Sequence, residues 1–146
     1  MATYKGSYKP KNPEKYKGDV SSIIYRSGWE RSCMNYFDNN PNVIEWQSEE
    51  VIIPYRSPID GRLHRYFPDF KIKVRDKTGK ISTYLIEVKP FNQTQPPVLK
   101  SRKTKRYINE VKTYGINSSK WDAALQYCAD RGWKFQIITE HELGLK

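Results

Sequence analysis

Three residues in the middle of the chain have the types and spacing for metal-assisted hydrolysis of a phosphodiester. Asp69 follows Pro68, and one residue separates Glu87 from Lys89. Two carboxylates on neighbouring antiparallel strands, about 5 Å apart, can share one divalent cation. Glu87 and Lys89 face the same side of a strand, so the lysine can orient a water beside that cation. Magnesium is the expected ion because it prefers oxygen ligands and keeps several waters.

This short motif is weak by itself. Glu-x-Lys on a strand is common, usually as a solvated cross-strand pair, and short motif matches are often accidental. Two features favour a site: Asp is disfavoured inside strands, and Asp69 lies between Phe67 and Phe70, where an unpaired carboxylate would be costly. Glu30 could supply a third carboxylate from an upstream helix, although it equally fits the acid of a helix-capping box.

Other catalytic chemistries have little support in the sequence. The two cysteines, Cys33 and Cys128, are far apart, and His64 and His141 are the only histidines. This set does not fit a four-ligand zinc site, and scarce histidine disfavours a Ser-His-Asp or Cys-His triad. We expect both cysteines to be reduced and partly buried.

Length and composition indicate one globular domain. The chain has 146 residues, of which 37% are hydrophobic, enough for one core. No apolar run approaches the roughly 18–20 residues of a membrane span, and the first residues lack the apolar region of a secretory signal. Membrane and secreted classes are therefore not expected.

The charge indicates a polyanionic partner, because 26 Lys and Arg against 16 Asp and Glu give a net charge of +10. Half of it lies in residues 98–112. The residues expected to contact DNA phosphates are Lys100, Arg102, Lys103, Lys105 and Arg106. A solvated face that keeps the protein soluble is an equally weighted alternative for such a run.

The elements that must position these residues begin with residues 1–22, a polar, Lys- and Pro-rich stretch that we expect to be a basic extended arm. Residues 23–146 are expected to form a single domain. Ser27 and Glu30 have the spacing of a capping box, which predicts a helix to about Asn39. Strands are predicted within 43–55, 63–75 and 81–89, joined by polar turns.

The second half of the domain is predicted to be mainly helical. One helix should run from about Arg102 to Tyr114 and end at Gly115, and another should begin at Ser118 or Ser119 and end before Gly132. A strand at 133–138 and a short helix at 140–145 complete the chain. An antiparallel meander followed by a helical crossover and another strand predicts an α/β/α mixed sheet.

The site residues resemble those of the PD-(D/E)xK nuclease superfamily, with Pro68-Asp69 and Glu87-Val88-Lys89 as the two halves of the motif. Glu30 resembles the helix-borne glutamate of junction-resolving and transposon end-cleaving members. Almost the whole chain resembles the head completion nucleases of T-even-type tailed phages. Residues 25–30, 53–55, 65–69, 87–90, 94–97, 109–111 and 117–121 carry this more specific likeness.

The resemblance implies a restriction-endonuclease-like fold and a metal-dependent DNA endonuclease that acts in phage head completion, after DNA packaging and before tail joining. It implies Mg²⁺, with Mn²⁺ as a substitute, held by Asp69, Glu87 and the backbone carbonyl of Val88. Lys89 would be the catalytic lysine, and Glu30 would complete the catalytic set. Glu49 and Glu50 cannot be placed from the sequence.

The implied partners are double-stranded DNA and phage head or head–tail connector proteins, with no membrane. The implied location is the host cytoplasm during phage assembly, with the virion as an alternative. A non-catalytic DNA-binding protein that joins heads to tails on a nuclease fold is the competing function, because one fold can carry many functions. Junction resolution ranks last, because no dimer surface is evident in the sequence.

Overall fold

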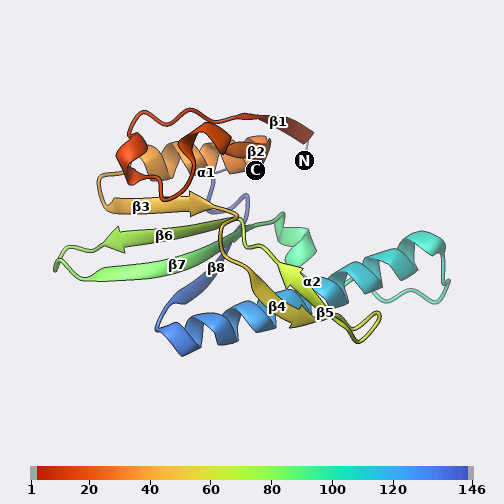
Figure 1. The fold of residues 1–146 in the computed structure, drawn as a ribbon. Helices are drawn as coiled ribbons and strands as arrows, with labels where there is room; N and C mark the ends of the chain where they lie inside the picture. The colour runs from red at the N-terminus through yellow and green to blue at the C-terminus, as the bar shows by residue number, and fades with distance from the viewer. Residues whose placement is uncertain (1–2, 145–146) are drawn as a thin grey trace.

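The computed structural model describes residues 3–144, and a four-stranded mixed sheet forms its centre (Figure 1). The strand order is β3 (Val43–Ser48), β6 (Phe70–Arg75), β7 (Ile81–Val88) and β8 (Lys134–Ile138). The first three strands are antiparallel, and β8 runs parallel to β7. A parallel neighbour requires a crossover, and the chain between β7 and β8 supplies it.

Two helices cover the two faces of this sheet. Residues of α1 (Gly28–Asn39) pack with β3, β6 and β7 in one buried cluster, whereas α2 (Lys105–Arg131) packs with β7 and β8 in another. The predicted α/β/α mixed sheet is therefore confirmed. No helix within residues 3–144 is long and apolar enough to span a membrane.

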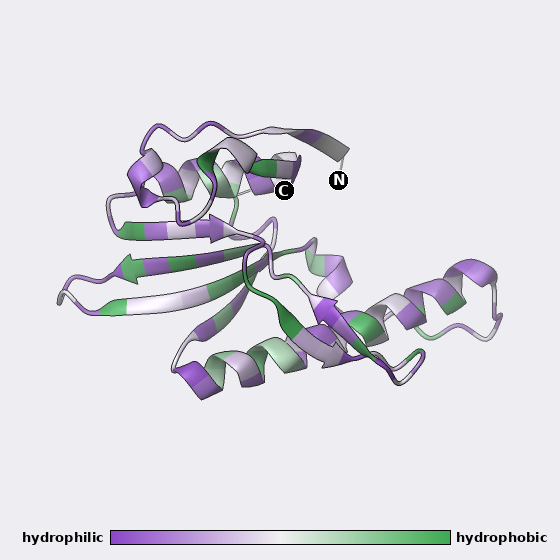
Figure 2. Cartoon of the chain, viewed as in Figure 1, coloured by the Kyte–Doolittle hydropathy of each residue, from purple (hydrophilic) through white to green (hydrophobic). Residues whose placement is uncertain are grey.

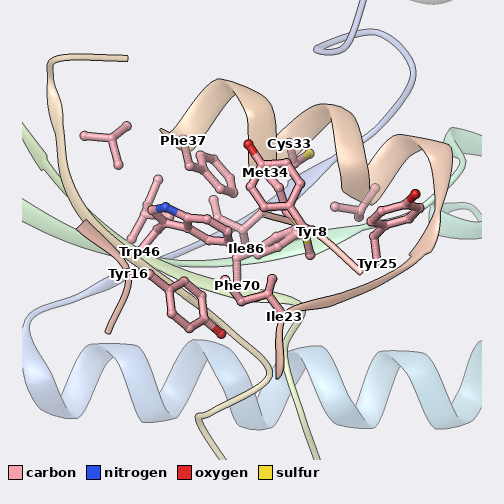
Figure 3. Packing of buried hydrophobic residues seen from close by; sticks show 13 residues of the cluster. Tyr8, Tyr16, Ile23, Tyr25, Cys33, Met34, Phe37, Trp46, Phe70 and Ile86 are labelled. Atoms are coloured by element: carbon pink, nitrogen blue, oxygen red, sulfur yellow. The ribbon is translucent and has the colours of Figure 1, made fainter. Parts of the chain in front are cut away.

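The first cluster is rich in aromatic rings (Figure 3). Phe37 of α1 meets Phe70 of β6 edge to face, with ring centroids 5.1 Å apart, and Trp46 of β3 is fully buried beside them. Such pairs stabilise a fold beyond the burial of their area. This packing fixes α1 above the end of the sheet where β6 begins.

Two predicted strands are each split in the structure. Residues 43–55 form β3 and β4 (Ile53–Arg56), and residues 63–75 form β5 (Leu63–Tyr66) and β6. The first break contains Glu49, which has a left-handed φ of 55°, and the second contains Pro68, which cannot donate to a strand ladder. Consequently β4 and β5 form a separate hairpin, and Asp69 comes immediately before β6 rather than inside a strand.

Residues 3–22, expected as an extended arm, pack onto the domain. The strand β1 (Thr3–Ser7) pairs with β2 (Ile24–Ser27), and Tyr8 and Tyr16 are buried in the first cluster. The Lys15 ammonium donates to the carbonyls of Phe37, Asp38 and Asn40 at the C-terminal end of α1. That position favours a cation, so charge and packing both fix the segment. The 3-10 helices Pro13–Lys15 and Val20–Ser22 complete it.

The prediction of two helices separated at Gly115 is wrong, because α2 is one helix of 27 residues. Thr104 caps its start by accepting a hydrogen bond of 3.1 Å from the Tyr107 N–H, and Gly132 ends it in a left-handed conformation. A helical glycine costs roughly 0.5–1 kcal/mol. Buried residues on both sides of Gly115, including Tyr107 and Trp121, offset that cost.

Other predictions fared differently. The helix that begins after Ser27 and the strand that ends at Ile138 are confirmed. Both cysteines are free, as expected, and they are fully rather than partly buried. Residues 140–144 form turns rather than the predicted short helix, and Leu145 lies outside the described residues.

Candidate active site

The sheet register brings the two central carboxylates together. Phe70, the first residue of β6, pairs with Ile86 of β7, so Asp69 and Glu87 occupy adjoining positions on neighbouring strands. Asp69 Oδ2 accepts a hydrogen bond of 2.8 Å from the Val88 N–H. The end of β7 and the start of β6 meet beside the 3-10 helix η3 (Phe91–Thr94), as Figure 1 shows.

All four predicted catalytic residues line one small pocket of about 270 Å³. Its walls are Glu30, Asp69, Glu87, Val88, Lys89, Pro90 and Gln93. The Lys89 ammonium lies 3.7 Å from Glu87 Oε2 and is partly exposed, whereas Glu87 is almost fully buried. The pocket therefore brings together carboxylates from β7, from the residue before β6 and from α1, with the Lys89 ammonium beside them.

Burial shapes the electrostatics of this pocket. Removal from water raises the pKa of Asp69 well above its ordinary value, and the Glu87 charge raises it further. Burial also raises the pKa of Glu87, against the opposing effects of Tyr66 and Lys89. A bound cation would relieve the repulsion between these two carboxylates.

Glu30 takes part in capping α1 and also lines the pocket. The Ser27 hydroxyl accepts a 3.1 Å hydrogen bond from the Glu30 N–H, and Glu30 Oε1 accepts one of 3.3 Å from the Arg26 N–H. Burial raises the pKa of Glu30, and the Arg26 N–H opposes that rise. The capping and pocket roles proposed from the sequence are therefore geometrically compatible.

The two unplaced glutamates lie outside the set of pocket-lining residues. Glu49 forms an ion pair with Arg26, and its backbone N–H donates to the Asp69 carbonyl at 3.1 Å. It therefore supports the chain just before β6. The Glu50 charge acts on Tyr16, away from the carboxylate pocket.

Sequence reasoning missed two residues that act on Glu87. The buried Tyr66 hydroxyl donates a hydrogen bond of 2.5 Å to Glu87 Oε1. The Lys120 ammonium lies 5.7 Å from the centre of the Tyr66 ring, and its charge lowers the pKa of Glu87. Tyr66 comes from β5 and Lys120 from α2, so only the fold brings them to the site, and no local pattern indicates it.

The pocket fits a hard divalent cation better than a zinc ion. Within residues 3–144, no group of three or more His, Cys, Asp or Glu side chains is close enough to hold a metal by itself. Asp69 and Glu87 supply carboxylate oxygens, and Val88 lines the same space. Mg²⁺ is typically held by one or two carboxylates with waters completing its shell, which agrees with this donor set.

A larger groove of about 750 Å³ runs beside the carboxylate pocket and shares Gln93 with it. It lies between residues 92–97 and the first half of α2, whose Lys105 and Arg106 line it. Lys100, Arg102 and Lys103 are exposed just before the helix. The predicted DNA-binding residues thus gather at one end of α2, apart from the carboxylates.

One of these cations already has a partner, since Arg106 pairs with Glu110 one turn later at 3.3 Å. Lys103 lies 5.3 Å from the centre of the Tyr107 ring. Lys100, Arg102 and Lys105 are exposed as well.

Comparison with known proteins identifies the family. Residues 40–140 match the family model described as "TnsA-like endonuclease N terminal". The chain is 42% identical over 144 residues to the "Head completion nuclease" of Enterobacteria phage T4, covering 96% of this chain and 93% of that protein. The chain belongs to the head completion nuclease family. The resemblance seen in the sequence is confirmed.

The segment that matches the endonuclease model contains some of the site residues but not all of them. Asp69, Glu87 and Lys89 lie within the segment that matches the endonuclease model, whereas Glu30 precedes it. The alignment with the phage T4 protein covers nearly the whole chain, so the similarity to that protein extends beyond the segment that matches the endonuclease model.

Proposed function

We propose that this protein is a metal-dependent DNA endonuclease that acts in phage head completion, after packaging and before tail joining. The observation that carries the proposal is the buried pair Asp69 and Glu87, whose pKa values are both raised and which share a pocket with Lys89. Groups with strongly perturbed pKa values in a cleft are typical of catalytic sites. The printed name of the phage T4 relative supports the role in head completion.

In the proposed mechanism, Asp69, Glu87 and the Val88 carbonyl would hold Mg²⁺, or Mn²⁺ in its place. When bound, the cation would polarise the phosphate as a Lewis acid and make a nearby water more acidic. Lys89 orients the attacking water and offsets the negative charge that develops on the phosphate. Glu30, on the wall formed by α1, completes the set by accepting a hydrogen bond from that water.

The groove beside the pocket is the proposed path of the DNA backbone. Lys105 and Arg106 line it, and Lys100, Arg102 and Lys103 extend it. Each phosphate neutralised by a cation releases counterions, so the affinity should fall steeply with salt. The host cytoplasm during assembly is the proposed location, with the virion as the alternative, and head or connector proteins are the proposed partners.

Cleavage of supercoiled plasmid tests the proposal. Wild type should nick or linearise the plasmid with Mg²⁺ or Mn²⁺ and be inactive with EDTA. Asp69→Asn and Lys89→Met should each lower the rate by about 10²–10³-fold or more, with DNA affinity retained. Asp122→Asn and Lys77→Met are matched controls, because both residues are exposed and outside the pocket.

A non-catalytic DNA-binding protein that joins heads to tails is the second candidate, and the basic groove favours it equally. It predicts salt-dependent DNA binding without cleavage under any metal condition. Cleavage that survives Asp69→Asn at the wild-type rate would place the chemistry elsewhere and refute the assigned site.

A further inference from the structure

Two large apolar side chains stand out in the loop before α2. Val98 is 77% exposed and Leu99 is 89% exposed, the two highest values for large hydrophobic residues between residues 3 and 144. Figure 2 shows a short hydrophobic stretch in this loop, next to the hydrophilic first turns of α2. Burying such side chains removes apolar surface from water, so a partner that covered both would bind more tightly.

The charge around this pair indicates what that partner is. Residues 91–109 contain no Asp or Glu, and five basic residues follow Leu99 within that stretch: Lys100, Arg102, Lys103, Lys105 and Arg106. An apolar pair that is followed by a run of cations, with no acidic residue in the same stretch, is complementary to a polyanion with an apolar interior. Duplex DNA has both, because its stacked bases lie between two rows of phosphates.

The loop is also placed to reach the same DNA as the carboxylate pocket. Pro97, the residue before Val98, lines the groove that shares Gln93 with the pocket. Further along α2, Lys120 acts on Glu87 in the pocket.

We propose that Val98 and Leu99 form a wedge that inserts at a base step of the duplex whose backbone follows the groove beside the carboxylate pocket. Inserting an apolar side chain between two base pairs costs the free energy of unstacking them. The favoured substrate is therefore duplex DNA with a weakly stacked step, such as a mismatch. The inference rests on the proposed endonuclease function and adds a substrate class to it.

Fluorescence of 2-aminopurine tests insertion independently of cleavage. A duplex carries 2-aminopurine beside a single mismatch, and binding is followed in EDTA. Wild type should raise the fluorescence on binding, because 2-aminopurine brightens when it is unstacked. The double variant Val98→Ser, Leu99→Ser should lose the rise and bind this duplex about tenfold more weakly, while its salt dependence stays unchanged because every phosphate contact remains.

Ile81→Ser is the matched control, because Ile81 is 48% exposed at the end of β7 opposite Glu87. It should behave as wild type. The cut should also map at a fixed distance from the mismatch in wild type with Mg²⁺, and this preference should disappear in the double variant.

The outcomes separate the two proposals. If the fluorescence, DNA affinity and cut position of the double variant equal those of wild type, the wedge proposal is refuted. A loop that binds a head protein rather than DNA would give this result. Plasmid cleavage by the same protein would then still support the endonuclease. Conversely, fluorescence that depends on the wedge without cleavage in any metal would refute the endonuclease and retain DNA insertion.

Discussion

Replacing Tyr66 with Phe removes one hydroxyl and tests how the site holds Glu87. The Tyr66 hydroxyl donates a 2.5 Å hydrogen bond to Glu87 Oε1, and both side chains are buried. The other carboxylate oxygen, Oε2, is the one nearest Lys89. Tyr66 is thus expected to act as a positioning residue that fixes Oε2 on the pocket side.

The size of the effect follows from the burial of this bond. A hydrogen bond to a charged group contributes about 1.5–3 kcal/mol, and an unsatisfied buried acceptor costs a similar amount. We expect Tyr66→Phe to lower the free energy of unfolding by about 2 kcal/mol and Tm by about 6 °C. Loss of a hydrogen bond to a metal-binding carboxylate typically lowers metal affinity 10–100-fold.

The assay is calorimetric titration of Mn²⁺ into the protein at several pH values. Loss of the hydroxyl favours the neutral form of Glu87, so its already raised pKa should rise further. Metal binding should therefore weaken most at lower pH and partly recover as pH increases. Tyr55→Phe is the control, because the Tyr55 ring also lies near the Lys120 ammonium, 5.8 Å from it.

Equal Mn²⁺ affinity in Tyr66→Phe and Tyr55→Phe across the pH range would refute this reasoning. A loss of stability without a loss of affinity would make Tyr66 a purely structural residue.

Three further predictions concern stability. Asp69→Asn removes the charge that repels Glu87, so the metal-free protein should gain about 1 kcal/mol in chemical unfolding, as mutations at functional sites often do. Burial raises the pKa of Asp69, so the folded protein holds a proton there more tightly than the unfolded chain does. The free energy of unfolding of wild type should therefore fall as pH rises from about 4 through the raised pKa, and its difference from that of Asp69→Asn should widen. A constant gap would contradict this. Gly115→Ala should stabilise α2 by roughly 0.5–1 kcal/mol, since the new Cβ would meet Pro58 Cγ at an ordinary 3.7 Å; a lower Tm would show an unrecognised clash. Ser27→Ala should cost about 1 kcal/mol through the lost helix cap, and unchanged thermal unfolding would show that the cap is dispensable.

Local patterns were sufficient for the elements that carry the pocket. The number of residues between Asp69 and Glu87 suits a hairpin, and β6 and β7 do bring the two positions side by side. The Ser27 capping signal placed α1 correctly. These features depend on residues that are close in the sequence, so they can be predicted from it.

Features decided by packing were not predictable in the same way. The alternation of apolar residues in 63–75 continues through Pro68, and nothing local shows that β5 leaves the main sheet to pack with β4. Gly115 has the sequence appearance of a helix end, but the buried face of α2 continues past it. Tyr66 and Lys120 reach Glu87 only through these long-range contacts.

The position of a bound metal tests the central claim most directly. Crystals grown with Mn²⁺ would locate the ion by its anomalous scattering. A peak within about 2.0–2.3 Å of oxygens of both Asp69 and Glu87, absent from Asp69→Asn crystals, is the predicted result. A Mn²⁺ ion bound elsewhere, with these two carboxylates left without it, would contradict the assignment of this pocket as the catalytic centre.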